Sequence, residues 1–421
     1  MEQVEYPRGV VVRIGYDSIR NYIYWSTLLG LFSGMVRIRV SVFISLYDLI
    51  MLTNLVLMFL FKNVVRIPWR MICFMLFLAV SAVIGIAHGT DTMALAIKEL
   101  LGISVSVLYA YCFFRMIRND FERAFSKYAD LAFWFTVIAF PLWVGSCIYA
   151  QDYERLRGLT AEPTAFCILI LPAYYWYAYR YFTLRVDGMR VVTFTVALIL
   201  SNSTNGLASA MLGVILLLAG FGRMKYLLAI PVVLGGLFAL AYYTSPGFQL
   251  RISDTLRAIA SRNVNGSNLS TFALISNVFV TEQVLKESPV IGNGLGSHPV
   301  SHDRYLANIP GVAPFVSIGA AGLNAPEAAS LGLRSLSELG ILGFAGILTF
   351  VFYFRVGGTG PRAAMSNAML VVFFLKIIRD GGYFAPEQFF FVFIYILNHR
   401  QYMIDRKLSG REAQSRFRWS I

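Results

Sequence analysis

Charged residues and cysteine are both scarce in this chain of 421 residues. Only 14% of the residues are charged, well below the ~25% of a soluble globular protein, whereas 57% are hydrophobic. The four cysteines form no CxxC pair, so neither a disulfide framework nor a zinc site is indicated. The composition excludes a soluble globular protein and indicates one that crosses a membrane many times.

Apolar runs recur along the chain, and we expect twelve membrane spans from them. Their expected ranges are 21–36, 40–61, 71–88, 93–114, 129–149, 163–182, 191–203, 205–221, 226–243, 335–354, 363–378 and 387–399. Whether 191–203 and 205–221 are one span or two stays open, because the first of them is short for ~30 Å of hydrocarbon. Residues 1–20 are polar and basic, without the apolar core that a signal peptide needs.

Lys and Arg are distributed unevenly between the two sides of this arrangement. With the N-terminus in the cytoplasm, the cytoplasmic segments hold 23 of them and the short external segments 6. Because short cytoplasmic loops are enriched in these residues, both termini are expected in the cytoplasm. Much of the net charge of +13 then serves orientation and contact with anionic lipids, and nucleic-acid binding is not expected.

This topology divides the chain into four parts. They are an N-terminal membrane bundle (1–243), a large external loop (244–334), C-terminal membrane helices (335–399) and a basic cytoplasmic tail (400–421). Loops of such length are usually functional or disordered. Within this one, 251–263 and 271–287 carry apolar residues at helical spacing, which predicts amphipathic helices lying in the membrane interface.

Several arginines fall on the external side, against the topological bias. Arg155 and Arg157 are expected at the outer mouth of the sixth span, and the others are Arg257, Arg262 and Arg379. Guanidinium groups bind phosphate oxygens through paired hydrogen bonds, so this set would suit a lipid diphosphate. The alternative is ion pairing with external carboxylates. These carboxylates are Asp152, Glu154, Asp254, Asp303 and Asp380.

Acidic residues and a histidine on the same side are candidates for accepting a proton from an attacking hydroxyl. The candidate catalytic residues are His302, Asp303, Glu162 and Asp380. Tyr305 and Tyr383 are candidates for stacking on sugar rings, although aromatic residues are common at membrane interfaces for other reasons.

A glycine-rich turn and charges within the expected spans complete the candidate features. Gly292, Gly294 and Gly296 occupy alternate positions, which would permit close backbone approach to a ligand. Asp48 and Glu338 fall in expected spans, where a charge is costly and often functional. For Asp48 we expect a structural hydrogen bond to a neighbouring helix.

The order of four motifs resembles the superfamily of Wzy-type bacterial polysaccharide polymerases and O-antigen ligases, over about residues 40–400. The motifs are R-x-x-G before a proline (155–163), a polar turn (201–206), P-x-x-G-x-G (289–294) and the glycine-containing start of a span (338–343). The ligase branch has a histidine at the position that aligns with Ala329, so its absence weighs against a ligase.

This resemblance implies an all-α, GT-C-like glycosyltransferase in the bacterial inner membrane, with the large loop in the periplasm and no metal or other cofactor. The implied reaction is polymerisation: undecaprenyl-diphosphate-linked glycan is transferred onto a lipid-linked oligosaccharide repeat unit of O-antigen, capsule or exopolysaccharide. Membrane lipids, a chain-length regulator and a flippase are the implied partners. Two alternatives stay open: an O-antigen ligase acting on lipid A core, and a non-enzymatic polysaccharide or lipid transporter, for which repeated halves would be expected.

Overall fold

The structure is a computed structural model of the chain. The residues it describes are 16–34, 37–39, 43–61, 67–151, 153–160, 162–220, 236, 242–243 and 246–418. Across these ranges the protein is predominantly helical, and the described strands form one short antiparallel hairpin. Most of the expected ninth span, 226–243, lies outside the described residues, as does Asp152.

The N-terminal half consists of eight described helices and the hairpin. In chain order these are α1 (Tyr16–Gly30), β1 (Arg37–Arg39), β2 (Phe43–Ser45), α2 (Leu46–Phe61), α3 (Trp69–Ala87), α4 (Met93–Met116), α5 (Phe121–Ala150), α6 (Pro163–Leu184), α7 (Gly188–Ser201) and α8 (Thr204–Gly220). The segment 191–221 forms two helices, because Asn202 between α7 and α8 adopts a left-handed conformation (φ 43°) that ends α7.

The C-terminal half contains a lobe of short helices followed by three long ones. The lobe (residues 246–330) contains α10 (Pro246–Ser261), α11 (Leu269–Glu287), α12 (His298–Tyr305), η2 (Leu306–Asn308), α13 (Ala313–Ser317) and η3 (Ala325–Glu327). The long helices are α14 (Leu331–Tyr353), α15 (Pro361–Arg379) and α16 (Pro386–Arg418).

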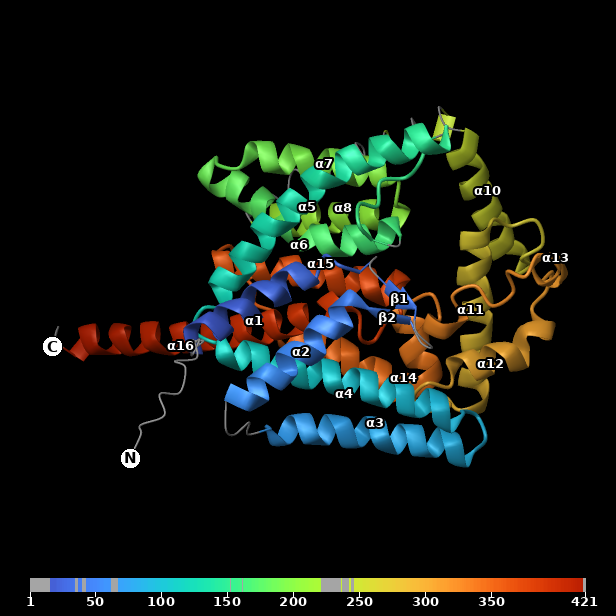
Figure 1. Ribbon diagram of the computed structural model, residues 1–421, viewed down its shortest axis with the longest axis horizontal. Coiled ribbons are helices and arrows are strands. Elements are labelled where there is room, and N and C mark those ends of the chain that lie inside the picture. The colour runs from blue at the N-terminus through green and yellow to red at the C-terminus, as the bar shows by residue number, and fades with distance from the viewer. Residues whose placement is uncertain are drawn as a thin grey trace, which may run out of the picture.

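Five of the described helices are long and apolar enough to cross a membrane, namely α3, α4, α5, α14 and α15. The helices α2, α7 and α8 are apolar but shorter. The chain is therefore a helical protein with several candidate membrane spans, and the number twelve stays a prediction. In Figure 1, α3, α4 and α16 run along the long axis, whereas α10 and α11 run across it at one end.

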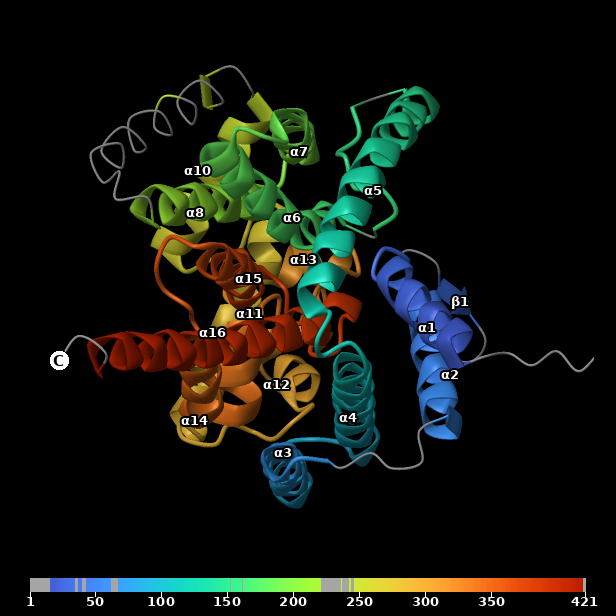
Figure 2. The same ribbon diagram turned by 90° about the vertical axis from the view of Figure 1, so that its left-hand side faces the viewer.

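The lobe and the ends of the described chain lie on opposite sides. Figure 1 places the start of α1 and the end of α16 at one end of the molecule and α10–α13 at the other. Figure 2 shows α15 and α16 in the middle, with α1 and α2 beyond α4 on one side and α6–α8 on the other. Helix α15 packs against α6, α8, α14 and α16, and its buried alanines allow this close approach.

Helix α14 is interrupted at Gly340, whose φ of 65° and ψ of −165° are not helical. Beyond the break, the N–H groups of Ile341 and Leu342 donate to the carbonyl oxygens of Pro289 and Val290, at 2.9 and 3.1 Å. A Cβ at position 340 would lie 2.3 Å from the Val290 oxygen, so only glycine fits. The segment before α12 thus satisfies backbone groups that the break leaves without helical partners.

The glycine turn at 292–296 packs on helices, not against an open ligand position. The N–H groups of Asn293 and Gly294 donate to the carbonyl oxygens of Ser337 and Glu338, each at 2.9 Å. A Cβ on Gly294 would lie 2.5 Å from the backbone of α3, and one on Gly292 would lie 2.6 Å from the Ser337 oxygen. The alternating glycines do permit close approach, but the expectation that a ligand approaches them was wrong, because their close neighbours are protein backbone.

One expectation about a polar residue in a helix was also wrong. Asp48 does not bond to a neighbouring helix; it lies in the first turn of α2 and accepts hydrogen bonds from the N–H and hydroxyl of Ser45, at 2.9 and 2.7 Å. In α11, which was expected as an amphipathic helix at the membrane interface, Val278 is 43% exposed, while Asn277 is fully buried. The reason is that Asn277 hydrogen-bonds to His298, so its polar side faces the protein.

Helix α10 does show an exposed apolar side. It covers most of the range 251–263 in which a helix was expected. Leu256 and Ile259 are 63% and 57% exposed, whereas Ala258 between them is buried. Exposed aliphatic side chains on a helix that runs across the end of the molecule are consistent with contact with the surface of a bilayer.

Candidate functional site

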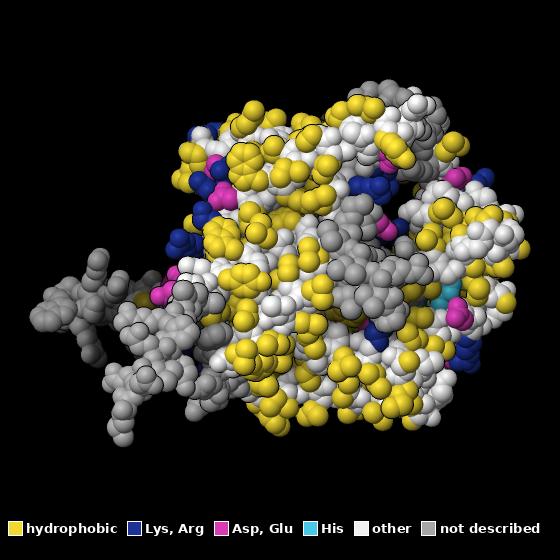
Figure 3. Space-filling model, viewed as in Figure 1, with side chains coloured by type: hydrophobic (Ala, Val, Ile, Leu, Met, Phe, Trp, Pro, Cys, Tyr) yellow, Lys and Arg dark blue, Asp and Glu magenta, His cyan; other side chains and the backbone are white. Residues whose placement is uncertain are grey.

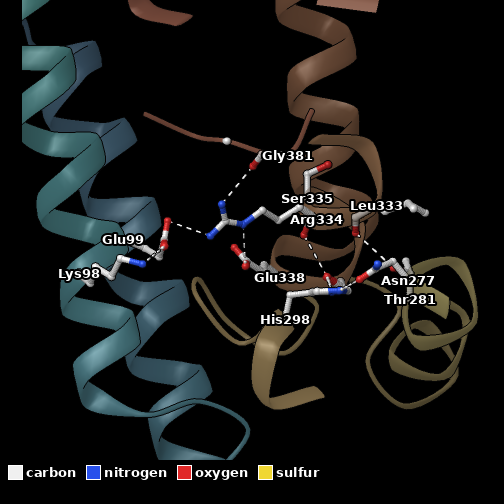
Figure 4. A network of polar contacts seen from close by, with 12 residues as sticks. Lys98, Glu99, Asn277, Thr281, His298, Leu333, Arg334, Ser335, Glu338 and Gly381 are labelled. Atoms are coloured by element: carbon white, nitrogen blue, oxygen red, sulfur yellow. Dashed lines mark hydrogen bonds and ion pairs between the residues drawn. The ribbon is translucent and has the colours of Figure 1, made fainter. Parts of the chain in front are cut away.

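A buried ion cluster lies where α4, α14 and the α15–α16 connection meet (Figure 4). Arg334, in the first turn of α14, pairs with Glu99 of α4 at 2.8 Å and with Glu338 at 3.0 Å. Its guanidinium also donates to the Gly381 carbonyl at 3.0 Å and lies 4.1 Å from the ring centroid of Tyr383. These three charged side chains are at most 6% exposed, so Arg334 fixes the α15–α16 connection against two candidate membrane helices.

The last turn of α15 carries a second buried cation. Lys376 is fully buried and its Nζ lies 2.5 Å from Asp380 Oδ2 and 3.0 Å from Glu387 Oε1. Asp380, a candidate base, is therefore neutralised by Lys376 rather than by Arg379.

Glu327 of η3 stands beside this connection, and no sequence motif pointed to it. The Glu327 carbonyl oxygen packs directly against Gly381, where an added Cβ would lie 1.6 Å from it. Burial and the charge of Asp380 raise the pKa of the Glu327 carboxyl, Arg334 and Lys376 oppose the rise, and Glu162 adds to it. The side chain nevertheless remains exposed to solvent. An accessible carboxyl with a raised pKa is suited to general base catalysis near neutral pH.

The structure thus brings two predicted candidates, Glu162 and Asp380, to the neighbourhood of Glu327 and Arg379. Glu162 precedes α6, and its charge also acts on Arg379 at the end of α15. Arg379 donates a hydrogen bond to the Ser270 hydroxyl at 3.0 Å and forms no ion pair with a described carboxylate. We call Glu162, Glu327, Asp380 and Arg379 the junction group, since they lie where the lobe meets the long helices.

The other predicted phosphate ligands have separate environments. Arg155 donates to the carbonyl oxygens of Ser201 and Asn202, at 3.3 and 2.9 Å, and so satisfies groups at the end of α7. Arg257 forms the expected alternative, an ion pair with Asp254 at 2.9 Å. Arg157 and Arg262 are exposed, and neither forms an ion pair within the described part of the chain; their side chains are available to a ligand. The arginines of the prediction are not one cluster.

One face of the molecule is hollowed between the helices and the lobe. Figure 3 shows this hollow, with basic and acidic side chains along its edge. Arg257 donates to the Gly266 carbonyl at 3.1 Å, and Arg379 binds Ser270, so both guanidiniums flank the start of α11. The arrangement combines accessible cations with carboxylates at the lobe end of the bundle.

Both histidines of α12 are buried. His298 places its Nδ1 2.7 Å from the Ser337 hydroxyl and its Nε2 2.8 Å from Asn277 Oδ1. Burial, reinforced by His302, lowers the pKa of His298 to about 3. Burial also lowers the pKa of His302, against the effect of the exposed Asp303. A fully buried imidazole does not reach a hydroxyl outside the protein, so the position of His302 gives its predicted catalytic role no support.

The two tyrosines chosen for sugar stacking are covered by protein. Tyr305 is 8% exposed within an apolar cluster of the lobe that includes Phe272 and Phe315. Tyr383 is 9% exposed and one face of its ring is occupied by Arg334. Rings in these positions have little surface to offer a sugar, and the predicted stacking role finds no support.

Four residues described here were absent from the predicted catalytic and phosphate-binding residues, although Glu338 was noted as a charge in an expected span. Arg334 and Glu338 are separated by one helical turn, and this spacing was the available signal for their ion pair. The contribution of Glu99 depends on how α4 and α14 pack, which the sequence does not reveal. Glu327 follows Pro326 in the last segment of the loop, and its importance arises only from contact with the α15–α16 connection.

Comparison with known proteins found no match, either to a protein-family model or to a curated protein. Among the described residues, no group of three or more His, Cys, Asp or Glu could hold a metal ion. The junction group, the exposed arginines and the order of the motifs are therefore the features that indicate a function.

Proposed function

We propose that the protein is a membrane glycosyltransferase that polymerises lipid-diphosphate-linked oligosaccharides at the face where the lobe lies. The observation that carries the proposal is the junction group, where carboxylates with different environments meet an arginine that has no carboxylate partner among the described residues. Transfer of a glycan from a diphosphate needs a proton acceptor and a stabiliser of negative charge. Carboxylates and guanidiniums supply these two functions.

Glu327 is the residue we assign as general base. The acceptor hydroxyl attacks the anomeric carbon of the donor, its proton passes to the Glu327 carboxylate, and the bond from that carbon to the diphosphate oxygen breaks. Undecaprenyl diphosphate leaves with the bonding electrons. Arg379 and the exposed Arg157 neutralise its charge, because a guanidinium can donate two parallel hydrogen bonds to phosphate oxygens.

The position of the lobe supports a periplasmic site in a bacterial inner membrane. The start of α1 and the end of α16 lie opposite the lobe, so the two ends can face one side of the membrane while the lobe faces the other. With the ends of the described chain in the cytoplasm, the basic segments face anionic lipid and the lobe faces the periplasm. Two motifs of the polymerase resemblance, at 289–294 and 338–343, are also hydrogen-bonded to each other.

The test is a reconstituted reaction with Glu327→Gln. Wild-type protein in nanodiscs receives a lipid-linked repeat unit, without nucleotide sugar, and the products are separated by chain length. We expect a ladder from the wild type, and a rate lower by about 10²–10⁴-fold from the variant, since glutamine accepts no proton. Glu287→Gln, which removes an exposed lobe carboxylate paired with Arg304, is the matched control and should keep the wild-type rate.

The pH profile of the ladder separates a base from a structural role. Glu327 must be ionised to act, so the wild-type rate should fall as the pH drops through the raised pKa of this carboxyl. A wild-type rate in Glu327→Gln would refute the assignment of the base. In a deletion strain, single repeat units on lipid should accumulate; long chains left on the lipid would indicate a ligase instead, and no ladder from any lipid-linked donor would refute a polymerase.

A further inference from the structure

A groove of about 390 Å³ lies where α11 crosses the start of α14. Val278 and Leu285 of α11 form one wall, and Leu333 and Leu336 of α14 form the other. The floor contains Thr281, which is buried and hydrogen-bonds to the Leu333 carbonyl at 3.5 Å. The groove is open and apolar, and it lies between a helix of the lobe and a candidate membrane helix.

The orientation of the two helices places the groove at the level of the membrane surface. Helix α14 is a candidate span, and Leu333 and Leu336 lie in its first two turns. Helix α11 runs across the long axis of the molecule (Figure 1), as a helix in the interface plane would. Val278 is 43% exposed, so the apolar wall is open to the hydrocarbon chains that reach this level.

One rim of the groove is polar without a net charge. Lys286 and Glu282 form an ion pair at 3.0 Å along the exposed side of α11, with side chains 60% and 45% exposed. A neutral polar rim over an apolar groove suits a hydrocarbon chain that lies along the interface. It does not suit an anionic headgroup, because the Lys286 ammonium already has a partner.

Helix α11 also connects the groove to the junction group. Its first turn holds Ser270, the partner of Arg379. At 1.5 Å per residue, Val278 is about 12 Å further along the helix axis and Lys286 about 24 Å. A lipid whose diphosphate binds at Arg379 could therefore lay its chain along α11 into the groove.

We propose that this groove binds the isoprenoid chain of the lipid diphosphate substrate. The inference rests on the proposed function for its substrate, but binding of the chain can be measured without any reaction. The proposal assigns recognition of the lipid to Val278, Leu285, Leu333 and Leu336, and separates it from the chemistry at the junction group.

Photo-cross-linking tests the proposal directly. A benzophenone side chain is placed at position 336, or at the control position 342, where Leu342 is 53% exposed on the same helix. Protein in phospholipid nanodiscs is irradiated with labelled undecaprenyl phosphate. We expect saturable labelling at position 336 that unlabelled undecaprenyl phosphate removes, and only weak, non-saturable labelling at position 342. Equal labelling at both positions, or a cross-linked dimer from position 336, would overturn the proposal.

Kinetics provide the second measurement. Leu336→Trp fills the groove, whereas Leu342→Trp adds the same bulk elsewhere on α14. For a long-chain donor, Leu336→Trp should raise KM about tenfold, the effect of excluding roughly two methylene groups from an apolar surface, and leave kcat unchanged. A short-chain donor should show no such rise. If both variants form the ladder with the wild-type KM, the groove does not bind the isoprenoid chain, but the polymerase proposal is unaffected. If no ladder forms but position 336 is labelled, the groove binds the chain and the polymerase proposal is wrong.

Discussion

Replacing Arg334 with methionine should destabilise the protein far more than removing a surface arginine. The substitution leaves Glu338 buried without a cation and the Gly381 carbonyl without its donor, while Glu99 keeps only the mostly exposed Lys98, at 3.8 Å. Removing one partner of a buried pair costs about 3–5 kcal/mol. Arg304→Met is the matched control, because Arg304 and Glu287 are 54% and 44% exposed. Exposed pairs contribute about 0.2–1 kcal/mol.

Thermal unfolding in nanodiscs measures the difference, with folded protein followed by gel filtration after heating. Arg334→Met should show a large fall in melting temperature, and Arg304→Met almost none. The triple variant Arg334→Met, Glu99→Gln, Glu338→Gln removes the unpaired charges and should recover much of the loss, since neutral replacements of a buried ion cluster are often tolerated. Equal, small losses in the two single variants, or no recovery in the triple variant, would refute the reasoning.

Two other substitutions test the backbone break and the leaving-group site. Gly340→Ala forces a Cβ to within 2.3 Å of the Val290 oxygen at a φ of 65°, so the yield of folded protein should collapse. Gly346→Ala is the control and should fold normally, because a Cβ there meets nothing within 4 Å. A normal yield from Gly340→Ala would show that the break is dispensable. Arg157→Ala should abolish long-chain product without loss of folded protein, and Arg157→Lys should restore little, because an ammonium cannot bridge two phosphate oxygens; a full ladder from Arg157→Ala would exclude this role.

The helical class could be predicted because membrane helices are encoded locally. A run of apolar residues with a polar boundary specifies a span irrespective of its neighbours, and α3, α4 and α5 lie close to their expected ranges. The burial of Arg334, in contrast, could not be predicted from the local sequence. Arg334 was assigned to the end of the loop, yet α14 begins at Leu331 and buries it, because Glu99 and Glu338 supply the compensating charge.

The site was predictable only in part for the same reason. Glu162, Asp380 and Arg379 were chosen from topology, and they do lie near one another. The environment of each side chain depended on tertiary contacts: Lys376 neutralises Asp380, the end of α7 engages Arg155, and burial removes His302 from solvent. Residue type identified the candidates, but burial and partners decided which of them remain accessible.

The break in α14 has a consequence for how the chain is assembled. The N–H groups that follow Gly340 find their acceptors about fifty residues earlier in the chain, in 289–290. A nascent α14 that enters the bilayer alone would expose those groups to hydrocarbon, at a cost of several kcal/mol each. Where α14 spans a bilayer, delivery of the 289–294 segment before or together with its lateral release would satisfy these groups, so folding of the lobe would precede completion of the last three helices.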